Sequence, residues 1–242
     1  MHLLALLAIG LACTHILSGK LTFLDTIPRS RWLSAAGGVS VAYVFIHLLP
    51  ELSERQQAFE HTRGIVTFLE DHVYLVALTG LSVFYGLERA ALRSRRSNRQ
   101  AGKQDATSAG VFWIHIFSFT FYNALIGYLL VHRQEPGFFG ALLFAIAMSL
   151  HFVVNDHGLR ENHKRDYDRV GRWILAVAVV IGFLIGRATE IDELALSVLF
   201  AFLAGGVILN VLKEELPEER ESNFWAFLLG TIVYTVLLLV AD

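Results

Sequence analysis

Long apolar segments recur along the whole chain, and they restrict its fold more than any other feature. A helix of about 20 residues crosses a hydrocarbon layer of about 30 Å. Eight segments approach or reach that length: 3–18, 32–49, 73–92, 111–131, 138–157, 173–186, 194–212 and 224–241. The 242 residues are 55% hydrophobic and 17% charged, with a mean hydropathy of +0.52, which is more apolar surface than one soluble core can bury. The sequence therefore predicts an all-α polytopic membrane protein whose eight transmembrane helices form a single transmembrane domain, 1–242.

The distribution of basic residues predicts the orientation of these helices. The connections that follow the first, third, fifth and seventh segments hold 16 Lys and Arg, whereas the other connections hold 4. The count of 16 includes Arg89, which lies near the end of the third segment. Because cytoplasmic connections retain positive charge, we expect both termini outside, in a bacterial-type plasma membrane. The basic connection at about 93–107 is expected to be a mobile cytoplasmic loop beside anionic lipid. A net charge of −2 gives no support to nucleic-acid binding.

An internal repeat is the next signal. Residues 36–39 read Ala-Gly-Gly-Val, and Leu-Pro-Glu follows at 49–51; residues 204–207 also read Ala-Gly-Gly-Val, and Leu-Pro-Glu follows at 216–218. The two copies would cross the membrane in opposite directions. This pattern predicts an inverted repeat in which segments 1–3 are mirrored by 6–8, an arrangement typical of transporters. Close helix packing and helix termination explain the same residues without a repeat.

Polar side chains inside the fourth and fifth segments are the candidates for a central site, because such groups are costly in hydrocarbon. Asn123 lies near the centre of the fourth segment. His151 and Asn155 are four residues apart and share one face of the fifth. Asp156 is turned about 140° from His151 on an ideal helix. We expect these residues to receive a polar or cationic guest, with Asp156 as the one nearby carboxylate.

With these features the chain resembles the ZIP (Zrt/Irt-like) family of metal transporters over nearly its whole length. Residues 45–51, Phe-Ile-His-Leu-Leu-Pro-Glu, are similar to the family's His-Leu-Leu-Pro-Glu signature. Residues 122–127 stand where the family has His-Asn-x-x-Asp-Gly, and residues 151–156 stand where it has His-Glu-x-Pro-His-Glu. The resemblance implies a 3+2+3 inverted-repeat bundle that transports a divalent metal ion such as zinc or iron.

The chain departs from the family at the residues that hold the metal. The resemblance implies a binuclear site built from the first, second and fifth residues of each motif, which here are Tyr122, Asn123, Ile126, His151, Phe152 and Asn155. Zinc and iron(II) prefer imidazole, thiolate and carboxylate ligands. We therefore expect a degenerate site that holds one ion at most. Hydrogen bonding between helices explains His151 and Asn123 equally well.

Charged and histidine side chains also lie at the helix ends. His47 and Glu51 share a face at the outer end of the second segment, where the resemblance implies the entrance to the pathway, although a structural helix end explains them as well. The inner ends of the fourth and fifth segments form either an exit cluster or a solvated rim, and the adjacent cations favour the rim. The residues concerned are His115, Asp156, His157, Glu161 and His163, beside Arg160, Lys164 and Arg165.

No motif of a soluble enzyme occurs, so we expect a protein that is not an enzyme and has no certain cofactor. Two hypotheses remain: a divergent ZIP-like transporter of a divalent cation, and a transport-incompetent ZIP-like scaffold that serves as a structural or accessory membrane subunit. The expected partner is the lipid bilayer, and a homodimer or a second membrane protein stays open.

Overall fold

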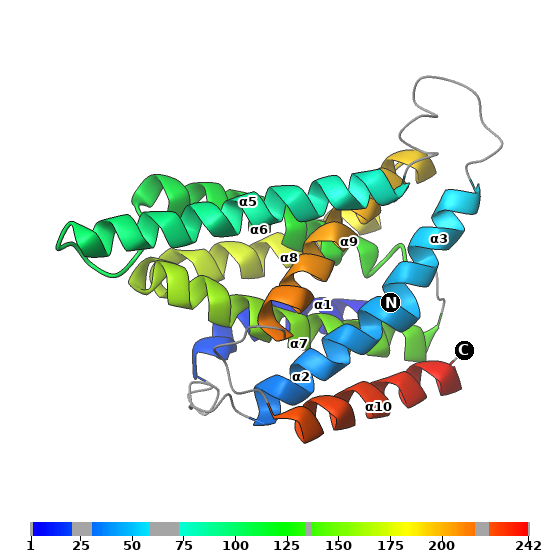
Figure 1. The fold of residues 1–242 in the computed structure, drawn as a ribbon. Coiled ribbons are helices and arrows are strands. Elements are labelled where there is room, and N and C mark those ends of the chain that lie inside the picture. Colours follow the sequence, from blue (N-terminus) through cyan, green and yellow to red (C-terminus); the bar gives the residue numbers. More distant parts are fainter. Residues whose placement is uncertain (1, 21–30, 59–72, 134–136, 216–222, 242) are drawn as a thin grey trace. The chain divides into compact units, whose positions relative to one another are not determined.

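The computed structural model describes residues 2–20, 31–58, 73–133, 137–215 and 223–241. Every secondary-structure element in these ranges is helical (Figure 1). In chain order the elements are α1 (His2–Leu17), η1 (Ser18–Lys20), α2 (Arg31–Tyr43), η3 (Val44–Leu48), α3 (Leu49–Ala58), α5 (Val73–Gln100), α6 (Ala109–Leu129), α7 (Phe138–His163), η4 (Tyr167–Gly171), α8 (Arg172–Ala188), α9 (Glu193–Glu215) and α10 (Phe224–Ala241).

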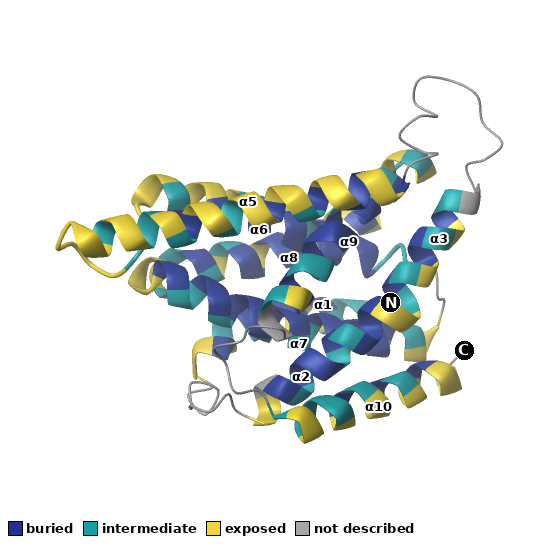
Figure 2. Cartoon of the chain, in the orientation of Figure 1, coloured by how far each residue is buried: buried dark blue, intermediate teal, exposed yellow. Residues whose placement is uncertain are grey.

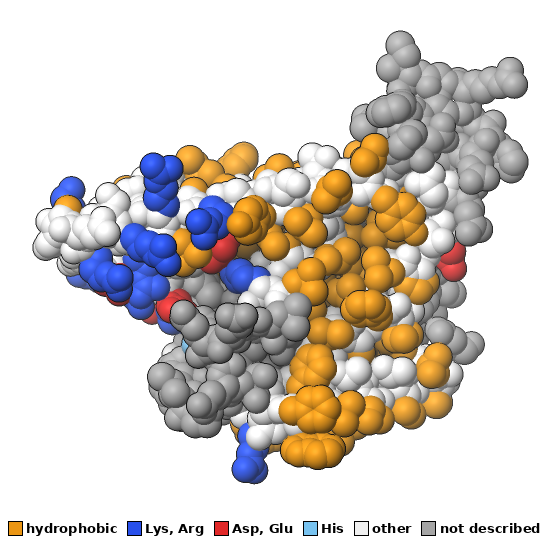
Figure 3. Space-filling model, viewed as in Figure 1, with side chains coloured by type: hydrophobic (Ala, Val, Ile, Leu, Met, Phe, Trp, Pro, Cys, Tyr) orange, Lys and Arg blue, Asp and Glu red, His pale blue; other side chains and the backbone are white. Residues whose placement is uncertain are grey.

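The helices have the length and surface of membrane-spanning segments. Seven described segments are long and apolar enough to cross a bilayer: His2–Lys20, Ser34–Gln56, Val73–Gln100, Ala109–Leu129, Phe138–His163, Tyr167–Ala188 and Glu193–Lys213. Phe224–Val240 is apolar but shorter. Large apolar side chains such as Phe117 and Trp225 are exposed, and Figure 3 shows hydrophobic side chains over much of the face in view. The chain is therefore an all-α multi-pass membrane protein, and its eighth span stays a prediction.

The chain divides into two compact units. Unit 1 contains Met1–Thr26 and Gly86–Thr189, and unit 2 contains Ile27–Tyr85 and Glu190–Asp242. Unit 1 thus holds α1, α6, α7 and α8 together with the last part of α5. Unit 2 holds α2, α3, α9 and α10 together with the first part of α5. Figure 2 shows long buried stretches on α7 and many exposed residues on α5 and α10.

In unit 1, glycines bring helix backbones into direct contact. Helix α6 packs against α8, and α1 packs against α7 and α8. A Cβ atom added to Gly182 of α8 would lie 1.8 Å from the carbonyl oxygen of Ala124, and one added to Gly127 of α6 would lie 2.1 Å from that of Val179. Any side chain at these positions would force the two helices apart.

In unit 2, both Ala-Gly-Gly motifs make contacts of the same kind. A Cβ atom on Gly38 of α2 would lie 2.1 Å from the Phe227 carbonyl oxygen of α10, and one on Gly205 of α9 would lie 1.8 Å from the Ala77 carbonyl oxygen of α5. Helices α2 and α9 contact each other and run in opposite directions (Figure 1). The second Leu-Pro-Glu, at 216–218, lies outside the described residues.

Two π-helical turns place residues of interest. Turn η3 ends just before Pro50, whose missing N–H leaves the Ile46 carbonyl without its usual helical donor. Turn η4 follows Lys164, whose φ of 50° ends α7. His47 lies in η3 and Tyr167 lies in η4, in keeping with the frequent occurrence of π turns at functional positions.

Several helices extend beyond the predicted segments. Helix α7 continues from the predicted end at 157 to His163, and α5 continues from 92 to Gln100. The prediction of a loop beginning at 93 was therefore wrong for residues 93–100, which are helical; the non-helical connection covers only 101–108. Arginine and glutamine favour helix, and Arg95 gains a tertiary partner by remaining in it.

Candidate functional site

A fully buried carboxylate, Asp156 of α7, lies at the centre of a hydrogen-bond network in unit 1. Its Oδ1 atom lies 2.8 Å from Nδ1 of His15 and also accepts a hydrogen bond from the Tyr167 hydroxyl. Its Oδ2 atom accepts a hydrogen bond of 2.8 Å from the Ser18 hydroxyl. Helices α1 and α7 and the turns η1 and η4 thus converge on one side chain. A carboxylate in an apolar environment needs this number of donors.

His15 of α1 connects this carboxylate to α6. Its Nε2 atom lies 2.8 Å from Oδ1 of Asn123, and the Asn123 amide nitrogen in turn donates to the Phe119 carbonyl at 2.7 Å. Both ring nitrogens of His15 therefore face oxygen acceptors. Only the doubly protonated imidazolium donates from both nitrogens, so this arrangement fits a buried imidazolium–carboxylate pair. The ring of Phe152 lies against that of His15, with centroids 4.3 Å apart.

Arg160 joins the network at its more exposed edge. Its guanidinium donates to the Ser18 hydroxyl at 3.3 Å and to Asp168 at 2.8 Å. The same guanidinium lies 5.4 Å from the centre of the Tyr167 ring. The negative charge of Asp156 is thus surrounded by His15 and, through Ser18, by Arg160.

A second polar contact joins α6 and α7 at the positions of the family motifs. The Tyr122 hydroxyl lies 2.7 Å from Nε2 of His151. One turn further along α7, Asn155 is 6% exposed and its amide nitrogen has no hydrogen-bond partner in the described part of the chain. A buried amide without a partner needs an explanation, of which a bound water or ion is one. His151 and Asn155 are thus the predicted central residues that lie outside the His15 network.

The inner ends of α6 and α7 carry a third polar group. Nδ1 of His115 lies 2.8 Å from Nε2 of His163, and Nδ1 of His163 lies 2.5 Å from the Thr107 hydroxyl. Of the predicted inner residues, His115 and His163 thus come together. Asp156 belongs to the central network, and Glu161 lies 3.5 Å from Arg95. Among the described residues, this end has no carboxylate beside the paired imidazoles to complete a metal site.

In unit 2, His47 and Glu51 do lie near each other, but Glu51 is already engaged. Its Oε1 atom accepts hydrogen bonds of 2.6 and 3.1 Å from Arg55, whereas Nε2 of His47 is 3.8 Å from Oε2. Arg55 also donates to the Ser197 hydroxyl at 2.8 Å and stacks on Phe200. A cation attracted to Glu51 would have to compete with a buried guanidinium.

The structure thus divides the predicted central residues between two contacts. Asn123 and Asp156 belong to the His15 network, whereas His151 contacts Tyr122 and Asn155 follows one turn later on α7. The described residues contain no group of three or more His, Cys, Asp or Glu arranged to hold a metal ion.

Residues of the network that the sequence analysis missed are His15, Ser18 and Tyr167. The signal for His15 was available, because an imidazole within an otherwise apolar span is a candidate by the same rule that selected Asn123. Ser18 lies at the end of that span, one turn later. No pattern in the sequence pointed to Tyr167, which reaches Asp156 through the chain reversal at Lys164.

Comparison with protein-family models, with curated proteins and with solved structures gave no match for this chain. The class that the fold defines is therefore the broad one, a helical multi-pass membrane protein with a buried polar network in unit 1.

Proposed function

We propose that the protein is a divergent ZIP-like membrane transporter that holds a single divalent cation, weakly, beside His151 and Asn155. The observation that carries the proposal is the buried amide of Asn155, which has no hydrogen-bond partner among the described residues. The two ends of an amide are interchangeable by rotation, so its oxygen can be directed at a cation. His151, one turn away on α7, offers a nitrogen ligand.

The same contacts explain why binding would be weak. Tyr122 is hydrogen bonded to Nε2 of His151, so a cation at that nitrogen must first displace the hydroxyl. The charge of Asp156 is not available, since three donors hold it. Ile126 and Phe152, which stand at two of the motif positions, are fully buried and supply only apolar surface. A dication in a low-dielectric site needs negative charge close by.

Helix packing supports the inverted repeat on which this proposal rests. If segments 1–3 correspond to 6–8, then α1 corresponds to α8, α2 to α9, α5 to α10 and α6 to α7. The contact of α2 with α10 is then equivalent to that of α9 with α5. In the same way, the contact of α6 with α8 is equivalent to that of α7 with α1. Each of these contacts is present within its own unit. One glycine of each motif approaches a backbone carbonyl: the second glycine of the first motif, Gly38, and the first glycine of the second motif, Gly205.

Metal-dependent thermal stabilisation of the detergent-purified protein tests the proposal. We expect zinc to raise the Tm of the unaltered protein slightly, and His151→Ala to abolish that rise. The matched control is His132→Ala, which removes an imidazole that follows α6, lies 2.8 Å from the Gly186 carbonyl oxygen and stacks on Tyr128. Ile126→Asp combined with Phe152→Glu should increase the rise, because it returns two carboxylates to the motif positions.

Transport itself is measured by zinc uptake into liposomes containing the protein. We expect weak uptake that His151→Ala removes. Strong uptake that survives His151→Ala would show that the pathway lies elsewhere and would end the proposal.

A second candidate, the transport-incompetent scaffold, is favoured by a different observation. The ionisable groups of the central network are paired with one another, which gives the core a fixed geometry without any guest. This candidate requires that zinc neither stabilises the protein nor crosses the membrane, even after Ile126→Asp and Phe152→Glu.

A further inference from the structure

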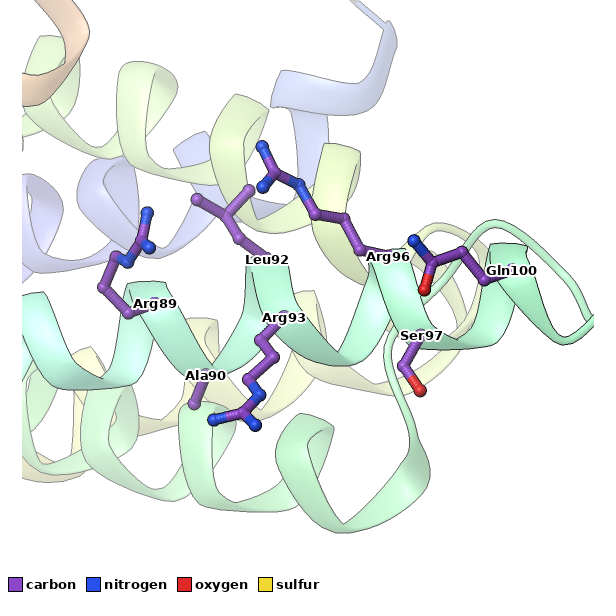
Figure 4. Close-up of a pocket in the computed structure, with 7 residues that line it drawn as sticks. All are labelled: Arg89, Ala90, Leu92, Arg93, Arg96, Ser97 and Gln100. Atoms are coloured by element: carbon purple, nitrogen blue, oxygen red, sulfur yellow. The ribbon is translucent and has the colours of Figure 1, made fainter.

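The last turns of α5 carry a row of exposed arginines. Arg89, Arg93 and Arg96 follow one another at intervals of four and three residues, which places them within about 60° of each other around the helix. They line a surface pocket together with Ala90, Leu92, Ser97 and Gln100 (Figure 4). In that view Arg89 and Arg96 extend to one side of the helix and Arg93 to the other. We call Arg89, Arg93 and Arg96 the arginine face.

The positive charge of the arginine face is not neutralised by carboxylates of the described residues. Arg95, on another side of α5, donates two hydrogen bonds of 2.8 Å to Asp105 and lies 3.5 Å from Glu161. Within the described ranges, none of the three arginines of the face forms an ion pair. Figure 3 shows Lys and Arg side chains gathered at the end of the molecule where α5 ends. This end of unit 1 therefore offers three guanidinium groups to a ligand.

The position of the arginine face along α5 matches the edge of a bilayer. The helix has 28 residues, and its first 20 already span about 30 Å, the thickness of the hydrocarbon core. With Val73 at one edge of the hydrocarbon layer, Arg89 and Arg93 lie where that layer ends, and Arg96 lies just beyond it. Apolar side chains on the preceding turns, including Leu78 and Val83, are exposed. Long arginine side chains at such a level reach the headgroup region.

We propose that the arginine face binds the phosphate headgroup of an anionic phospholipid. Guanidinium groups bind phosphate through paired, charge-assisted hydrogen bonds, and side chains extending to both sides of the helix can hold one headgroup between them. Ser97 and Gln100 add neutral donors, and Leu92 and Ala90 add apolar surface. A lipid fits this site better than free phosphate does, because exposed apolar surface continues from the pocket along the same helix. The inference does not depend on transport.

The test is a titration of the full-length protein in detergent with phosphatidylglycerol or phosphatidylcholine, followed by native mass spectrometry. We expect phosphatidylglycerol to be retained and phosphatidylcholine not. Each arginine near an anionic surface contributes about a fivefold change in affinity, so replacing all three by glutamine should weaken binding by roughly a hundredfold. The matched control replaces Arg99, Arg165 and Arg169, which are also exposed, by glutamine and should weaken binding by less than tenfold.

Equal retention of phosphatidylglycerol by the two triple variants would overturn the proposal, since it would assign binding to general surface charge. A separate arm adds inorganic phosphate alone. If phosphate raises the Tm as much as phosphatidylglycerol does, the site recognises a free anion and the lipid assignment is wrong. Should the triple variant fail to fold, Arg93→Gln carries the same test with an expected loss of about fivefold.

Discussion

Asp156→Asn measures the contribution of the buried network most directly. The carboxylate is fully buried and accepts hydrogen bonds from His15, Ser18 and Tyr167. Asparagine keeps the shape of the side chain but removes the charge and places an amide donor at one of the two oxygen positions. The Ser18 hydroxyl can reverse and accept from that donor. The bonds from His15 and Tyr167 have no such alternative and lose the assistance of the charge.

The magnitude follows from these contacts. A hydrogen bond to a charged group contributes about 1.5–3 kcal/mol and one between neutral groups about 0.5–1.5 kcal/mol, so two altered bonds lose about 2–3 kcal/mol. The imidazolium left without its partner adds to this loss, as in other buried pairs from which one member is removed. We expect the free energy of unfolding to fall by about 3 kcal/mol, which for a chain of this length lowers the Tm by about 6–12 °C.

Thermal unfolding in detergent, with two comparison variants, is the assay. Asp168→Asn is the control, because this carboxylate also binds an arginine but is 45% exposed at its side chain, where an ion pair contributes at most about 1 kcal/mol. The double variant His15→Gln with Asp156→Asn should lose less than the sum of the two single variants. A Tm shift for Asp156→Asn no larger than the control's, or additive losses in the double variant, would refute the imidazolium–carboxylate pair.

Three further outcomes are expected. Gly182→Ala should destabilise the protein by about 1–3 kcal/mol by overpacking, whereas Gly10→Ala, whose added Cβ meets nothing within 4 Å, should not; thermal unfolding compares the two. Tyr122→Phe should lower the metal-free Tm, because it removes the partner of a buried imidazole, yet enlarge the zinc-dependent rise. Hydrogen bonds from Arg95 hold the pKa of the Asp105 carboxyl below its usual value, so the stability from this pair is present above about pH 4 and lost as the pH falls through the lowered pKa. An NMR titration should show that Arg95→Gln raises that pKa.

The helical membrane fold could be predicted from sequence because it depends on the local length of apolar segments. The ends of the segments were harder to predict, because hydropathy detects where the bilayer ends and not where the helix does. Arg93 and Arg96 are too polar for a bilayer, yet they favour helix, and α5 continues through them. A loop was predicted there because the end of the apolar segment was taken to be the end of the helix.

The candidate site was predictable one helix at a time but not across helices. On an ideal helix Asp156 is turned about 140° from His151, and in the structure the two side chains contact different neighbours, so Asp156 does not join the expected central cluster. The identity of these neighbours depends on tertiary packing. The contact of Asp156 with His15 therefore could not be predicted from the spacing of residues within one segment. Tyr167 depends in addition on a positive φ at Lys164, a conformation that lysine adopts rarely.

The sequence separation of the central ion pair has a consequence for how the protein is made. His15 and Asp156 are 141 residues apart, and chain elongation at about 5–20 residues per second takes about 7–28 s to cover that interval. During this time α1 is already synthesised while α7 is not, so the imidazole has no carboxylate to pair with. The hydrogen bonds that join α1 to α7 can therefore form only after most of unit 1 has been synthesised.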